Sequence, residues 1–185
     1  HAHQLRHARA MQMLRDGEID AMLITMSHES VDGQPKADLA IRPLYTETLS
    51  VIAPQGHPLA GQRSVAWHAL TDERWILPPA PSCVNSTILN AFLAQGLAPP
   101  APWVLSSPPQ TNVSLVAAGL GISAVPTPFA GAVQGLGAVD LLRVAPQARL
   151  PPVSLVHRAA AAEDRNIQAL VQALDAVLPR AERRH

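Results

Sequence analysis

The sequence predicts an α/β protein with two lobes. Short apolar runs typical of strands alternate with segments of helical spacing, and this alternation favours parallel sheets covered by helices. The density of Pro and Gly rises at 54–58 and again at 145–152, which predicts that the chain crosses between two lobes at these points. A chain that crosses twice is typical of a hinged binding protein with its ligand in the cleft.

The first third of the chain is expected to form one helix and three strands. Apolar residues recur at helical spacing over 5–15, and Gly17 is expected to end that helix. The continuous apolar run at 21–24 predicts a strand that is buried on both faces. Two further strands are expected at 39–41 and 48–52.

Strands and helices alternate regularly between the two crossings. The elements expected there are a short helix at 65–71, a strand at 74–77, a helix at 82–95, a strand at 102–106, a helix at 110–118, a strand at 122–125, a helix at 128–134 and a strand at 139–144. After the second crossing we expect a strand at 151–157 and a long helix capped by Asp164. The apolar stripe of this helix consists of Ile167, Leu170, Val171, Leu174 and Leu178.

The composition is that of a globular protein without excess charge. Of the 185 residues, 48% are hydrophobic and 15% are charged, so enough apolar surface is present to form a core. Only 3% are aromatic, which predicts a core of Leu, Val, Ile and Ala. The 14 basic and 14 acidic residues balance, so the chain has no positive excess with which to neutralise nucleic-acid phosphates.

The cellular compartment is predicted from what the sequence lacks. No apolar run reaches the roughly 18 residues of a transmembrane helix, and the polar, His-rich beginning does not resemble a signal peptide. The single cysteine, Cys83, excludes an internal disulfide and fits a reducing compartment. We therefore expect a cytoplasmic protein that does not contact membranes.

Hydroxyl-bearing residues stand at three predicted junctions between a strand and a helix. They are Ser82, then Ser106 and Ser107 followed by Thr111, and finally Thr127. Helix N-termini attract carboxylate and phosphate oxygens, and ligands of open α/β sheets bind at the carboxyl ends of the strands. Each hydroxyl is also typical of a plain helix N-cap, so the alternatives are three caps or one pocket that accepts an anion.

No catalytic or metal site is predicted. The segment 119–124 matches the G-x-G-x-x-A dinucleotide pattern, but it ends a helix and enters a strand, which indicates a helix C-cap. His3 and His7 have the spacing of a metal clip without a third ligand nearby. Cys83 lies in the first turn of a helix, where a redox role would need a resolving cysteine that the chain does not contain. We expect no cofactor.

Four segments, taken in order, resemble the effector-binding region of LysR-type transcriptional regulators. They read LRDGEIDAMLI (14–24), RPLYTETLSVIAPQGHPLA (42–60), RWILPPAPS (74–82) and LVAAGLGISAVPTPFA (115–130). The resemblance implies two Rossmann-like lobes joined by a hinge, as in type 2 periplasmic binding proteins. Lobe I would comprise 1–53 and 152–185, lobe II would comprise 54–151, and the hinge would include Ala53, Pro54 and Pro151.

The resemblance also implies a small inducer, often with a carboxylate, in the cleft between the lobes. Ligand-driven closure or rotation of the lobes would then control DNA binding. Carried over position by position, the candidate effector contacts are Thr25, Met26, Pro79, Ser82, Ser106, Ser107 and Thr127.

Partners follow from the same resemblance. Members of this family form homodimers or homotetramers, and they bind DNA through a winged helix-turn-helix that precedes the effector region. This chain would be truncated at its N-terminus, because it starts in or after the first strand and helix of that region, and lobe I would expose a sheet edge. A solute-binding protein of a transport system with the same fold is the first alternative, and an enzyme on this fold is the second.

Overall fold

The computed structural model describes residues 7–25 and 38–178, and the chain divides into two compact units. Unit 1 comprises residues 1–46 and 151–185, and unit 2 comprises residues 47–150. The first boundary therefore lies seven residues earlier than the predicted crossing at 53/54, while the second lies next to the predicted one.

Unit 1 contains a three-stranded sheet in which every neighbour is antiparallel. Its order is β1 (Ala21–Thr25), β10 (Val153–Arg158) and β2 (Leu39–Tyr45). The chain leaves the unit after β2 and returns to it in β10, so these two strands run in opposite directions. The prediction of parallel pairing is wrong for this unit.

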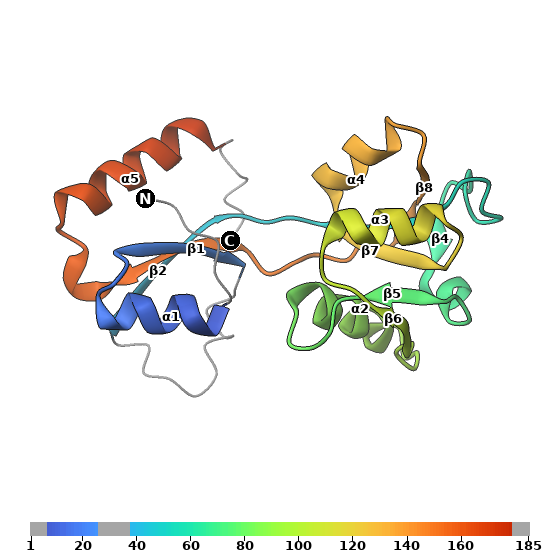
Figure 1. Cartoon of the computed structure of the whole chain (residues 1–185), viewed down its shortest axis with the longest axis horizontal. Helices are drawn as coiled ribbons and strands as arrows, with labels where there is room; N and C mark the ends of the chain where they lie inside the picture. The colour runs from blue at the N-terminus through green and yellow to red at the C-terminus, as the bar shows by residue number, and fades with distance from the viewer. Residues whose placement is uncertain (1–6, 26–37, 179–185) are drawn as a thin grey trace. The chain divides into compact units, whose positions relative to one another are not determined.

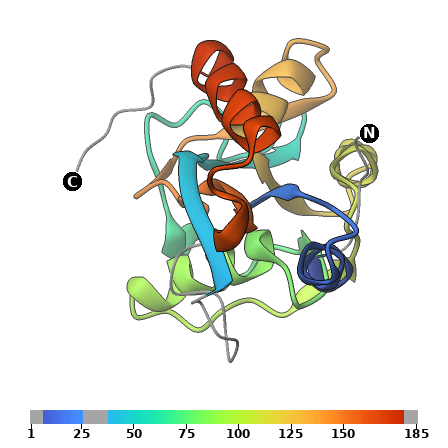
Figure 2. The ribbon, with the colours of Figure 1, turned by 90° about the vertical axis from the view of Figure 1, so that its left-hand side faces the viewer.

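Two helices flank the sheet of unit 1. Helices α1 (His7–Asp16) and α5 (Arg165–Val177) lie on opposite sides of it (Figures 1 and 2). Leu14 of α1 packs with Met22 and Val156 in one apolar cluster. Gly17 ends α1, as predicted. Its φ is 77°, a conformation that glycine adopts without a Cβ clash.

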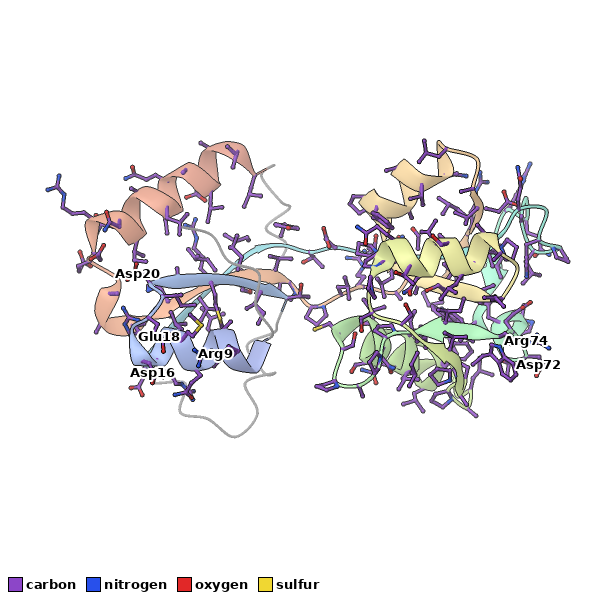
Figure 3. The ribbon with its side chains drawn as sticks, in the orientation of Figure 1. Arg9, Asp16, Glu18, Asp20, Asp72 and Arg74 are labelled. Carbon is purple, nitrogen blue, oxygen red and sulfur yellow. The ribbon has the colours of Figure 1, made fainter. Side chains whose placement is uncertain are left out.

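Polar interactions stabilise the ends of the two helices in unit 1. Arg9 of α1 lies 3.5 Å from Glu18 (Figure 3), and an Arg158 Nη1 donates to the carbonyl of Leu14 at 2.6 Å. The Asp164 side chain caps α5, as predicted, and accepts from the Asn166 amide at 2.7 Å. Of the predicted stripe on α5 only Ile167 is buried, so the helix covers its sheet less completely than its pattern suggested.

Unit 2 is built on a mixed five-stranded sheet. Its order is β6 (Pro102–Leu105), β5 (Trp75–Leu77), β7 (Ile122–Pro126), β3 (Leu49–Pro54) and β8 (Val139–Leu142). Strands β6, β5 and β7 are mutually parallel, as predicted, whereas β3 runs antiparallel to both β7 and β8.

Strand β3 explains why the predicted boundary and two hinge residues are wrong. Ala53 is fully buried in this strand and pairs with Asp140 of β8, and Pro54 pairs with Val139. The Pro- and Gly-rich segment at 54–58 is a turn within unit 2, where the Gly56 amide donates to Asp140. The chain crosses before β3, and Pro151, at the second boundary, stays a hinge prediction.

Helices cover both faces of this sheet. Helix α2 (Cys83–Ala94) lies on one side, and α3 (Pro109–Ala117) and α4 (Thr127–Gln134) lie on the other (Figure 1). The predicted helix at 65–71 is instead the two-residue strand β4 (Val65–Ala66) and a short 3₁₀ turn, and β4 pairs with β9 (Val144–Ala145).

Three aromatic residues pack in the core beneath α2, which the scarcity of aromatics did not predict. The Phe92 ring meets the rings of Trp67 and Trp75 edge-on, with centroids 5.2 and 5.9 Å apart. Both indole N–H groups are satisfied, since Trp67 donates to the Pro146 carbonyl and Trp75 to the Leu70 carbonyl. In the described residues no helix is long and apolar enough to cross a membrane.

The G-x-G segment joins α3 to β7, as predicted, and its second glycine is a steric requirement. Gly121 has a φ of 150°, and a Cβ at this position would collide with the backbone carbonyl oxygen of Arg74. The adjacent amide of Ile122 donates to that same oxygen at 2.8 Å. At Gly119 the φ is 78°, and a Cβ would meet nothing within 4 Å.

Gly121→Ala is therefore expected to lower the free energy of unfolding by about 2 to 4 kcal/mol, because it combines a backbone collision with an unfavourable φ. Gly119→Ala, the matched control, carries only the backbone cost of about 1 kcal/mol. Urea unfolding followed by tryptophan fluorescence measures both. Equal losses in the two variants would contradict the steric role of Gly121.

Candidate functional site

The carboxyl ends of three parallel strands meet at one edge of the sheet in unit 2. Strands β6, β5 and β7 end at Leu105, Leu77 and Pro126. Because these strands are neighbours and run the same way, the segments that follow them lie at the same edge. This carboxyl edge carries five of the predicted effector contacts: Pro79, Ser82, Ser106, Ser107 and Thr127.

The segment after β5 is held by side-chain hydrogen bonds. Ser82 is the N-cap of α2, and its hydroxyl accepts from the Asn85 amide at 3.5 Å. Asn85 is buried, and its Nδ2 donates to the Pro78 carbonyl at 2.6 Å. These bonds fix the turn between β5 and α2, and Pro79 stands exposed at its tip.

The two serines after β6 are not helix caps. The N-cap of α3 is Pro108, which makes no side-chain bond, so the capping alternative is wrong for Ser106 and Ser107. The Ser106 amide donates to the Leu77 carbonyl at 3.0 Å, and this bond holds the segment against the end of β5. Ser107 is exposed beside it. Their hydroxyls are thus not used to satisfy the helix start.

Thr127 is the centre of a cluster of polar side chains. It is the first residue of α4, and Pro126 is the N-cap, so Thr127 is not a cap either. Its Oγ1 lies 2.8 Å from Thr48 Oγ1 and 3.0 Å from Ser50 Oγ, and Gln147 Nε2 approaches it at 3.4 Å. We call Thr48, Ser50, Thr127 and Gln147 the hydroxyl cluster.

Three members of the hydroxyl cluster were not predicted from the sequence. Thr48 and Ser50 flank the start of β3, a strand that was expected to belong to the other lobe. Gln147 lies in the segment that leads out of unit 2. The alternation of Thr48, Leu49, Ser50 and Val51 was the available signal, because it places both hydroxyls on one face of the strand.

A buried polar atom without a protein partner lies at the same edge. Asn112, in the first turn of α3, is 3% exposed, and its Oδ1 has no hydrogen-bond partner among the described residues. Because α3 follows β6, its first turn lies at the carboxyl edge. A buried acceptor left unpaired is costly.

The other two predicted contacts belong to unit 1. Thr25 is the last residue of β1 in unit 1 and pairs with Val153 of β10. Met26 lies outside the described residues. His3 lies outside them as well, and among the described residues no group of three potential ligands could hold a metal ion.

The family model and the curated relative that match this chain both belong to transcriptional regulators. The family model described as the LysR substrate binding domain matches residues 2–179. A probable hydrogen peroxide-inducible genes activator of Mycobacterium avium is 28% identical over 159 residues, which cover 84% of this chain and 48% of that protein. The chain thus spans about half the length of this curated relative.

Solved structures match over most of the chain. The reduced form of the OxyR regulatory domain from Pseudomonas aeruginosa is 26% identical, with a TM-score of 0.71 over 92% of this chain and 79% of that one. The CcmR regulatory domain of Synechocystis PCC6803, solved in complex with 2-PG, is 21% identical, with a TM-score of 0.71 over 94% of this chain and 80% of that one. The second likeness shows the fold alone.

Cys83, the first residue of α2, is expected to be a poor nucleophile. Burial raises the pKa of its thiol, and this outweighs a backbone hydrogen bond that lowers the pKa. Since the thiolate is the reactive form, the native protein should react with iodoacetamide at neutral pH at least about fivefold more slowly than the urea-unfolded chain. The rate should rise as the pH is increased.

Mass spectrometry of timed samples measures this alkylation, and free cysteine serves as the reference. Native-state alkylation at pH 7 as fast as that of the unfolded chain would contradict the raised pKa.

Proposed function

The chain belongs to the LysR substrate-binding domain family, and from this we propose that it is the effector-sensing part of a transcriptional regulator. Its fold is that of the family's regulatory domains, α/β and two-lobed in the manner of periplasmic binding proteins, as predicted. The relatives are transcriptional regulators, which favours sensing over solute transport and over catalysis. The proposed setting is the cytoplasm.

The proposed ligand is a small molecule with a carboxylate. The observation that carries this proposal is the gathering of Ser82, Ser106, Ser107 and Thr127 at one sheet edge, beside the starts of α2, α3 and α4. Helix N-termini and hydroxyls favour anionic oxygens.

The proposed partners belong to the whole regulator. DNA would be bound by a winged helix-turn-helix elsewhere in the protein, and the regulator would form homodimers or homotetramers. An effector can shift such a protein only by its differential affinity for two arrangements. The proposed role of the carboxyl edge is to supply this differential affinity, together with Thr25 and Met26 of unit 1.

Calorimetric titration of the chain with benzoate, pyruvate, 2-oxoglutarate and 2-phosphoglycolate tests the proposal. We expect saturable binding of at least one of them. Ser82→Ala should weaken that binding about five- to tenfold, because one hydrogen bond to a ligand is worth about 1 kcal/mol. Ser86→Ala, an exposed change in the same helix, is the control and should bind as the unaltered chain does.

The two parts of the proposal fail in different ways. Equal affinities of Ser82→Ala and Ser86→Ala would show that Ser82 does not contact the ligand. Absence of binding by all four acids would contradict a carboxylate effector. Thermal melts of each variant separate lost affinity from the loss of the α2 cap, which costs about 1 kcal/mol.

A further inference from the structure

Arg149 stands directly across from the hydroxyl cluster. It forms an antiparallel bridge with Thr48, and the bonds on either side run from the Leu49 amide to Ala148 and from the Leu150 amide to Glu47. This pattern makes Thr48 and Arg149 a non-hydrogen-bonded pair, the arrangement that brings side chains closest. Their Cβ atoms are expected about 5 Å apart on the same face.

The alternation of side chains along the two paired segments shows on which face Arg149 lies. Leu49, Ala148 and Leu150, which alternate with the bridge residues, are all buried in the aromatic core of unit 2. Ser50 and Gln147, two residues from Thr48 and Arg149, point the other way, since both contact Thr127 Oγ1. Arg149 therefore starts on the face that carries the hydroxyl cluster.

The Arg149 guanidinium is available to a ligand. The residue is exposed, and within the part of the chain that the structure describes it makes no ion pair. Arg74 (Figure 3) differs, because it lies before β5, at the opposite edge of the sheet. Its guanidinium carbon lies over the Trp103 ring, 5.0 Å from the ring centroid.

We propose that Arg149 is the charged anchor of the effector's carboxylate, with the hydroxyls of Thr48 and Ser50 as its neutral neighbours. This inference rests on the proposed function and adds to it the residue that selects for charge. A guanidinium presents paired N–H groups that match the two oxygens of a carboxylate. The four residues of the hydroxyl cluster include no acidic side chain.

The anchor also predicts the class of ligand. One cation among uncharged donors favours a single carboxylate on a molecule whose remaining polar groups are neutral. A neutral amide of the same shape would keep its contacts with hydroxyls but lose the charged pair. Because Arg149 is exposed, salt should weaken the carboxylate interaction.

Four proteins test the proposal by calorimetry: the unaltered chain, Arg149→Gln, Arg149→Lys and the charge-matched control Arg74→Gln. The probes are the monocarboxylates benzoate, pyruvate and lactate, with benzamide as the neutral analogue of benzoate. We expect Arg149→Gln to weaken carboxylate binding about tenfold or more, as removal of a charge-assisted hydrogen bond does. Arg149→Lys should retain part of the affinity, and Arg74→Gln all of it.

The outcomes separate the anchor from the proposed function. If the unaltered chain and Arg149→Gln bind the carboxylates equally, the anchor is wrong and the sensing function stands. An equal loss for benzoate and benzamide would also overturn the anchor, because it would show a loss of shape rather than charge recognition. If the unaltered chain binds none of the three acids, the carboxylate-sensing function fails and the anchor fails with it.

Discussion

The candidate site depends on the short antiparallel ribbon where the chain enters and leaves unit 2. Two backbone hydrogen bonds, Leu49 to Ala148 and Leu150 to Glu47, both 2.9 Å long, join residues that lie about a hundred positions apart. The bonds fix the register of the ribbon, and a slip of one residue would turn every side chain to the other face. In this register Leu49 and Leu150 enter the core while the polar side chains face Thr127.

The two faces of the sheet in unit 2 differ in what they carry. On the α2 side the rings of Trp67, Trp75 and Phe92 pack together, and the N–H groups of both indoles are hydrogen-bonded. At the carboxyl edge, polar groups remain that do not satisfy helix starts, among them Ser106, Ser107 and the buried Oδ1 of Asn112. Rigid packing on one side lets the other side hold its polar groups in place before a ligand arrives, which reduces the entropy lost on binding.

The sequence predicted those features that depend on local pattern. The Asp164 and Ser82 caps, Gly17 at the end of α1 and the turn between α3 and β7 all follow from short stretches of chain. The antiparallel pairing in unit 1 and the meeting of Thr48, Thr127 and Gln147 could not be predicted, because both form only after distant segments pair. The crossing was misplaced because Pro54 and Gly56 mark a turn whichever lobe contains it, and sheet pairing alone decides that Ala53 belongs to unit 2.

An amide NMR titration tests whether small carboxylates bind at the carboxyl edge of unit 2. With ¹⁵N-labelled chain and increasing benzoate or pyruvate, we expect saturable shifts of the Ser50, Ser106 and Thr127 amides. Residues 72–74, at the opposite edge of the sheet, should not move. Shifts concentrated at residues 72–74, or a spectrum that neither acid changes, would show that carboxylates do not bind at this edge.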